Sequence, residues 1–191
     1  MLKKIPYDTA APILSRFVLS GDVPAEALAT KTPIEAIEAL RAAGALVDLV
    51  QFVAHALPAR EGVAWALACQ VDVLSPRTEM QQEIAAWVRD PQEVRRLALL
   101  SRLDEIGTNT PEGWLCAAVV WCGAGSIVPP PNPPVFPPEF LHAKALLGAV
   151  ALLAQPRSAA EDPPDHVALT DAVAVRACEV AKGGWPLPEG A

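Results

Sequence analysis

The amino-acid sequence predicts an all-α fold, a single bundle of about eight helices crossed by a proline-rich extended strap. The chain is 52% hydrophobic but only 5% aromatic, and alanine, a strong helix former, supplies most of the excess. A capping residue followed by proline, which is typical of a helix start, recurs along the chain. Valine and isoleucine occur in runs with helical spacing and never in long alternating runs, so no strand is predicted.

Five of the predicted helix starts are a Ser, Thr or Asp followed at once by proline. The first side chain can accept a hydrogen bond from a helix amide. Proline suits the next position because its missing N–H would be unpaired there. Two starts also carry a glutamate three residues on, Glu35 and Glu93, as in a capping box. The pairs are Thr32-Pro33, Ser75-Pro76, Asp90-Pro91, Thr110-Pro111 and Asp162-Pro163.

These starts divide one domain, residues 1–191, into helices, with a core over about residues 32–182 and a C-terminal tail at 183–191. Gly44 and Gly107 are expected to end two of the helices. The predicted helices lie near 33–43, 45–56, 59–72, 77–89, 91–105, 111–122, 138–154 and 163–181, after a weakly patterned segment near 8–19 and a short turn near 24–29.

The spacing of apolar residues predicts which helix faces are buried. Residues 143–154 are apolar nearly all round, which is typical of a central helix. Trp65 is also expected in the core, whereas Trp185 in the tail could either fold back or stay exposed. The predicted buried stripes are Ile84, Trp87 and Val88; Val94, Leu97 and Ala98; and Trp114, Ala117, Ala118 and Trp121.

The segment SIVPPPNPPVFPPEF, residues 126–140, contains seven prolines. Apolar side chains alternate with the prolines and charge is absent until Glu139, unlike a polar disordered linker. We therefore expect a strap, residues 126–138, laid across the bundle with Val135 and Phe136 anchored in it. Two alternatives stay open: a ligand for a groove lined by aromatic residues, because the PxxP spacing occurs there, and plain disorder.

Charge and hydropathy exclude several classes of function. The net charge of −7, with scattered basic residues, argues against binding to nucleic acid or to an anionic membrane surface. The longest apolar run, AKALLGAVALLA, is too short to span a bilayer. The opening MLKKIPYDTAAP lacks the apolar core of a secretory signal. A soluble, cytoplasmic protein is therefore expected.

The sequence shows no recognisable catalytic, metal or cofactor motif. The histidines are isolated from one another, and no cysteine or histidine pair has the spacing of a metal site. Arg60 and Glu61, close in sequence to Trp65, are the one polar pair that could line a pocket, although an ordinary ion pair is the simpler interpretation. Four cysteines lie in apolar helical runs and are expected to be reduced and buried: Cys69, Cys116, Cys122 and Cys178.

An ordered set of motifs resembles an uncharacterised family of small all-helical bacterial proteins, loosely associated with gene clusters for type VI secretion. The resemblance covers roughly residues 55–155 and implies a helical fold and a secretion context, but no catalytic residues. Its motifs are REGVAWALAC at 60–69, AWVRDP at 86–91, TPEGW at 110–114, Trp121 with Gly125-Ser126, the proline-rich segment, and AKALLGAV at 143–150.

The expected function is that of a non-enzymatic protein-interaction module. The resemblance implies an adaptor, chaperone or accessory protein for secretion cargo, with a secreted effector or spike component as partner. One alternative is an enzyme or small-ligand-binding protein with an inter-helix pocket near Arg60 and Glu61, and another is an immunity protein to a neighbouring toxin. The residues expected to contact a partner protein are Val135, Phe136, Phe140 and Trp185.

Overall fold

The computed structural model describes residues 2–74, 77–123, 125–129, 131–156 and 162–185. Over these residues the chain forms ten α-helices, one short 3₁₀ helix and no strand, which confirms the predicted all-α bundle. The elements are α1 (Ala11–Leu14), α2 (Ala25–Ala29), α3 (Pro33–Ala42), α4 (Leu46–Ala56), α5 (Ala59–Val73), α6 (Glu79–Arg89), α7 (Glu93–Ile106), α8 (Pro111–Val120), α9 (Leu141–Ala151), η1 (Leu152–Ala154) and α10 (His166–Ala181).

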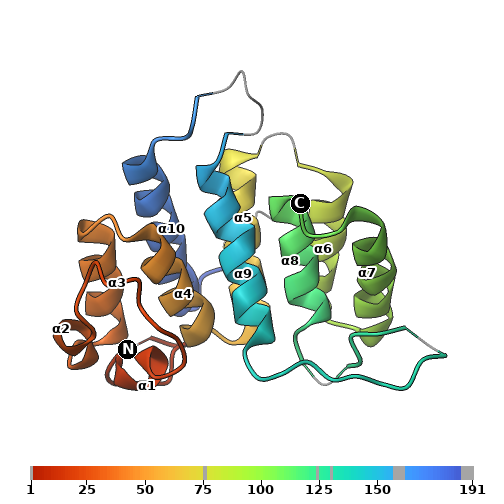
Figure 1. Cartoon of the computed structure of the whole chain (residues 1–191), viewed down its shortest axis with the longest axis horizontal. Coiled ribbons are helices and arrows are strands. Elements are labelled where there is room, and N and C mark those ends of the chain that lie inside the picture. Colours follow the sequence, from red (N-terminus) through yellow and green to blue (C-terminus); the bar gives the residue numbers. More distant parts are fainter. Residues whose placement is uncertain (1, 75–76, 124, 130, 157–161, 186–191) are drawn as a thin grey trace.

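Helix α9 stands in the middle of the bundle, as its apolar sequence predicts. It packs against α4, α5 and α8, which come from three different parts of the chain. Helices α3, α4 and α10 lie on one side of α9, and α6, α7 and α8 lie on the other (Figure 1). The inward residues of α9 are small or aliphatic, among them Ala143, Ala145 and Ala149, so neighbouring helices can approach closely.

Two of the predicted helix starts are confirmed in detail. The Thr32 hydroxyl accepts a hydrogen bond from the amide of Glu35, whose carboxylate in turn accepts one from the Thr32 amide, completing a capping box. The Thr110 hydroxyl likewise accepts a hydrogen bond from the amide of Gly113 at 3.1 Å. Ser75-Pro76 lies outside the described residues, and α6 begins after Thr78, which has a capping box of its own.

Two other predicted starts are wrong. Asp90 ends α6, and α7 begins only after Gln92, so the capping box with Glu93 does not form. Asp162 does not cap α10 either. The cap is Asp165, whose carboxylate accepts from the two amides that follow in the first turn. Two consecutive prolines separate Asp162 from Asp165, and each disfavours helical geometry at the residue before it, which moves the start later.

The start of α9 also differs from the prediction. Pro138 is not the first helical residue; the helix begins at Leu141, after Phe140. Phe140 has φ 59° and is the one non-glycine residue with a positive φ in the described part of the chain. By contrast, Gly107 ends α7 with φ 64°, as predicted, because glycine has no Cβ to strain in that conformation.

The predicted burial of the helix faces is confirmed on α6 and wrong on α7. Ile84, Trp87 and Val88 are buried. On α7, Val94 and Leu97 are 73% and 38% exposed, and the buried face of the helix instead contains Arg96, Leu99 and Leu100. The reason is a set of polar contacts made by Arg96: its guanidinium donates to the carbonyl of Val120 at 3.0 Å and to the carboxylate of Glu93 at 2.7 Å.

The burial of the tryptophans and cysteines agrees largely with the prediction. Trp65 is fully buried and its indole N–H donates to the carbonyl of Val173 at 3.2 Å. Trp114 and Trp121 pack edge to face, 6.2 Å apart, but are only partly buried. All four cysteines are free thiols; Cys69, Cys116 and Cys122 are buried and Cys178 is half-buried.

Candidate functional site

The proline-rich segment forms a loop with a tied base. The amide of Ile127 donates to the carbonyl of Val135 at 2.8 Å, and the amide of Val135 donates to the hydroxyl of Ser126 at 3.1 Å. The same hydroxyl donates to the carbonyl of Val128 at 2.9 Å. The described parts of the loop extend sideways from the lower ends of α8 and α9 (Figure 1).

This loop presents its two central apolar side chains to solvent. Val135 is 48% exposed and Phe136 is 61% exposed, so the expectation that they are anchored in the bundle is wrong. Hydrogen bonds join Val135 to Ser126 and Ile127, so the chain folds back on itself at the base of the loop, and the described parts of the loop extend away from the helices (Figure 1). The segment is a projecting loop and not a strap.

Phe140 and Trp185, also expected to contact a partner, have different surroundings. Phe140 is half-buried and packs against the core, so it faces its own protein. Trp185 is 45% exposed, and the Arg60 guanidinium lies 5.5 Å from its ring centre. The rest of the tail lies outside the described residues. Val135 and Phe136 are therefore the large apolar residues that the described part of the loop exposes.

Arg60, Glu61 and Trp65 are each held by contacts within the fold. The Arg60 guanidinium donates to the carbonyls of Val88 at 2.7 Å and Arg89 at 3.1 Å, and thereby satisfies the end of α6. Glu61 pairs with Lys4 at 2.6 Å. Trp65 is buried with no exposed surface. These residues hold elements together, and none of the three is among the described residues that line the cavity beside Pro58 and Ala59.

A cavity of about 240 Å³ lies instead where the N-terminal segment meets the starts of α5 and α9. It brings together basic and aromatic side chains that are far apart in the sequence, and the described residues that line it include no aspartate or glutamate. Its lining residues are Pro6, Tyr7, Arg16, His55, Ala56, Leu57, Pro58, Ala59, Phe140 and His142.

Arg16 is the centre of this cluster. Its guanidinium lies 4.7 Å from the centre of the Phe140 ring and 5.1 Å from that of the Tyr7 ring, in cation–π geometry. It donates to the carbonyl of His55 at 2.5 Å and to the Tyr7 hydroxyl. The His55 imidazole packs between Phe17 and Phe140, at 5.0 and 5.5 Å between ring centres.

Burial keeps both histidines of the cluster uncharged near neutral pH. Loss of hydration lowers the pKa of His142 to about 4. Burial also lowers the pKa of His55, and the positive charges of Arg16 and Lys144 act in the same direction. No sequence pattern predicts this cluster, because Arg16 lies in a weakly patterned segment, His55 lies near the end of α4 and His142 lies at the start of α9.

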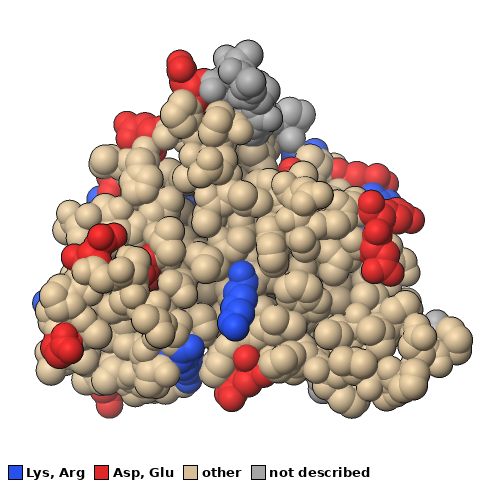
Figure 2. Space-filling view, in the orientation of Figure 1, with Lys and Arg blue, Asp and Glu red and all other residues tan. Residues whose placement is uncertain are grey.

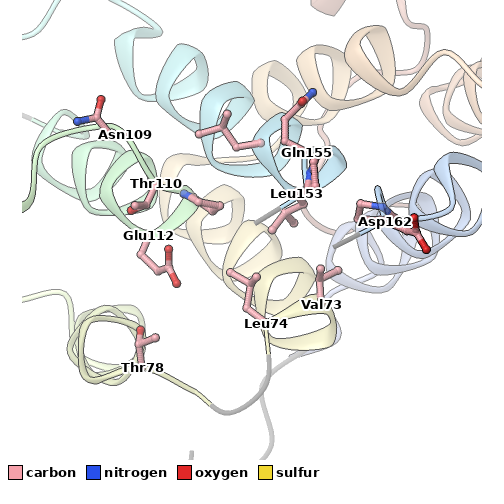
Figure 3. A pocket seen from close by; sticks show the side chains of 13 residues that line it. Val73, Leu74, Thr78, Asn109, Thr110, Glu112, Leu153, Gln155 and Asp162 are labelled. Carbon is pink, nitrogen blue, oxygen red and sulfur yellow. The ribbon is translucent and has the colours of Figure 1, made fainter. Parts of the chain in front are cut away.

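A second, larger cavity of about 910 Å³ lies near the opposite end of the helices. Val73, Leu74 and Leu153 form apolar walls between Glu112 on one side and Asp162 on the other (Figure 3). The described residues that line it are Val73, Leu74, Thr78, Asn109, Thr110, Pro111, Glu112, Leu152, Leu153, Gln155, Pro156, Asp162 and Pro164.

The surface around the loop carries little charge. Figure 2 shows few charged side chains over α8, α9 and the loop, while acidic side chains gather toward the margins of this face. Three partly buried apolar residues lie on these helices: Trp114 on α8, Trp121 at the C-terminal end of α8, and Leu147 on α9. The exposed apolar side chains of the loop therefore lie next to a face with low charge density.

Neither a cluster of metal ligands nor a membrane-spanning helix is found among the described residues. Among them, no group of three or more His, Cys, Asp or Glu side chains could hold a metal ion. None of the helices formed by these residues is both long enough and apolar enough to cross a bilayer.

Comparison with known proteins identifies the family of the chain. Neither the curated proteins nor the solved structures that were compared include a match. Residues 36–177 match a family of unknown function, DUF6931, over a longer stretch than the roughly 55–155 that the motifs indicated. This match extends from α3 into α10 and so includes the central helix, the loop and most of both cavities. The chain therefore belongs to the family of unknown function DUF6931.

Proposed function

We propose that this protein is a non-enzymatic interaction module that binds another protein through the loop at residues 126–140. The observation that supports the proposal is the exposure of Val135 and Phe136 on a loop whose base is tied by Ser126. An exposed aromatic residue is a typical interface anchor. Because the base of the loop is already ordered, binding would cost less conformational entropy than folding a free peptide.

The partner should offer an apolar groove and not a charged patch. Residues 126–138 contain no charged side chain, and Glu139 is the first one. Proline-rich segments with extended backbone are typically bound by grooves lined with aromatic residues. The resemblance to proteins of type VI secretion clusters suggests the biological role: a cytoplasmic adaptor, chaperone or accessory protein, with a secreted effector or spike component as partner.

Co-purification with the products of neighbouring genes tests this proposal. The tagged wild-type chain should retain one of them, and the double variant Val135→Ser/Phe136→Ser should lose it. Val175→Ser is the matched control, because Val175 is 55% exposed on α10 and lies outside the loop. Equal retention by the loop variant and the control, or retention of none of the products by the wild type, would contradict the proposal.

The larger cavity favours a second candidate function, binding of a small molecule. Its volume of about 910 Å³ is within the range typical of ligand pockets. Carboxylates on two sides of apolar walls suit an alkyl chain with an ammonium group. Alkylamines should raise the melting temperature of the wild type more than alkyl carboxylates of equal length, and Glu112→Gln should reduce the difference. Equal shifts for both ligands would exclude this function.

A further inference from the structure

The charge of Arg16 is not balanced by an acid in the described part of the chain. Arg16 is half-buried, and its two hydrogen bonds go to the uncharged carbonyl of His55 and hydroxyl of Tyr7. A partly desolvated guanidinium without a counter-anion is unfavourable, so an anionic ligand would stabilise it. The contrast is with five other arginines that pair with carboxylates: Arg41, Arg95, Arg96, Arg102 and Arg176.

Other hydrogen-bonding groups in the same cavity are also unused. The Tyr7 oxygen accepts from Arg16, which leaves its own hydrogen free to donate. The Nδ1 of His55 lies 2.8 Å from the carbonyl of Gln51, and because a carbonyl can only accept, Nδ1 carries the proton. Neither Nε2 of His55 nor either ring nitrogen of His142 has a hydrogen-bond partner among the described residues, and with the proton on Nδ1 the Nε2 of neutral His55 can only accept.

The electrostatics of the cavity favour negative charge. The start of α5, at Pro58 and Ala59, lines it without a side-chain cap, so the positive end of that helix faces the cavity. The negative end of α4 also lies here, but Arg16 already binds its His55 carbonyl. Glu61, the acid in the first turn of α5, is neutralised by Lys4 at 2.6 Å.

We propose that this cavity binds a small tetrahedral oxyanion of the phosphate class. Arg16 would donate to two of its oxygens at once, since the planar guanidinium matches that geometry, and Tyr7 would donate to a third. His55 and His142 would each donate a hydrogen bond to the anion in the protonated form, since Nε2 of neutral His55 carries no hydrogen. The volume of about 240 Å³ accommodates the anion with room for only a short substituent.

Binding should be coupled to the uptake of a proton. In the free protein both imidazoles are neutral at pH 7, because burial lowers their pKa values. A bound dianion would favour the protonated forms of both imidazoles. Its negative charge would offset the positive charges of Arg16 and Lys144, which lower the pKa of His55. Affinity should therefore increase as the pH falls from 8 toward 6, about tenfold for one coupled histidine.

A titration with sulfate and with inorganic phosphate, followed by NMR of the histidine ring signals, tests this proposal. Sulfate keeps its charge over this pH range, so any pH dependence must come from the protein. The expected result is a saturable shift of the His55 and His142 signals, and a dissociation constant for sulfate that falls with pH. Arg16→Gln should weaken sulfate binding about tenfold or more. Arg95→Gln is the control and should leave sulfate binding unchanged, because Arg95 is exposed and pairs with Asp90.

His142→Asn is an independent variant, because Arg16 also holds the N-terminal segment. This variant removes no hydrogen bond within the described residues, and it should both weaken sulfate binding and reduce its pH dependence. The proposal is overturned if the ring signals show no saturable shift, or if acetate binds as tightly as sulfate. Unchanged affinity and pH dependence in His142→Asn would also overturn it.

Discussion

The Arg16 guanidinium lies 4.7 Å from the centre of the Phe140 ring, and this contact joins the N-terminal segment to the end of the proline-rich loop. The same ring lies 5.5 Å from that of His55 on α4. The backbone of Phe140 has φ 59°, a left-handed conformation that residues other than glycine rarely adopt. The packing of one ring on an arginine and a histidine thus offsets an unfavourable backbone geometry.

Substitution of Phe140 separates these two effects. Phe140→Ala should lower the free energy of unfolding by about 1–3 kcal/mol, because a half-buried ring loses its contacts while the left-handed backbone remains. Phe140→Gly also loses the ring but removes the backbone strain, worth about 1 kcal/mol. Chemical denaturation should therefore find the glycine variant more stable than the alanine variant, and the reverse order would contradict the assignment of strain to this residue.

Arg96 is expected to stabilise the packing of α7 on α8. Its side chain is 4% exposed and it supplies a donor to the carbonyl of Val120. Arg96→Leu should lower the free energy of unfolding by about 1–3 kcal/mol, because that buried carbonyl is left without its partner. Arg95→Leu is the control on the exposed side and should have little effect. Equal stability of the two variants in urea denaturation would show that Arg96 does not stabilise this contact.

Gly148 allows α9 to approach Trp114 on α8. A Cβ at Gly148 would lie 2.6 Å from Cδ2 of the Trp114 ring, whereas one at Gly62 would lie 2.8 Å from the flexible end of Leu146. Gly148→Ala should therefore destabilise the protein by about 1–3 kcal/mol and change tryptophan fluorescence. Gly62→Ala should be nearly neutral, because the leucine can move and alanine favours the helix. If thermal unfolding finds the Gly62 variant equally destabilised, the rigid tryptophan contact is not the cause.

His142 should make the protein less stable in mild acid. Burial lowers its pKa from an ordinary 6.5 to about 4, so between these pH values the unfolded chain binds more protons than the folded one. The contribution of the neutral His142 side chain to the free energy of unfolding is fully present above pH 6.5 and is lost as the pH falls toward 4.

Between pH 7 and pH 4.5 the free energy of unfolding should consequently fall by about 1–2 kcal/mol less in a His142→Gln variant than in the wild type. His166→Gln is the matched control, since His166 is exposed at the start of α10. Denaturant titrations at both pH values measure the difference. Parallel losses in the wild type and the His142 variant would show that this imidazole is already protonated without cost in the folded state.

Local signals in the sequence were sufficient for most of the helices. Thr32 and Thr110 cap their helices as predicted, because a cap depends only on residues within one turn. Asp90 and Asp162 are not caps: α7 begins after Gln92, and at Asp162 the two prolines that follow move the start of α10 to Asp165. The face of α7 could not be predicted from hydropathy, because a buried arginine replaces the apolar stripe.

The candidate sites depend on contacts between distant parts of the chain. Val135 and Phe136 are apolar residues in a proline-rich segment, but their exposure and the hydrogen bond between the Ile127 amide and the Val135 carbonyl depend on how the segment folds back, which no local pattern indicates. The Arg16 cluster needs α4, α9 and the N-terminal segment to meet. Side-chain chemistry that a fold assembles in this way is invisible to motif searches of one sequence.

Site-specific photo-crosslinking in the native cell tests the central claim most directly. A benzophenone side chain at position 136, in place of Phe136, should give one discrete crosslinked protein, and the product should come from a neighbouring gene. The same group at position 175, which is exposed on α10, should not give this product. A product common to both positions, or none at position 136 in cells that contain the partner genes, would contradict the assignment of the loop as the binding element.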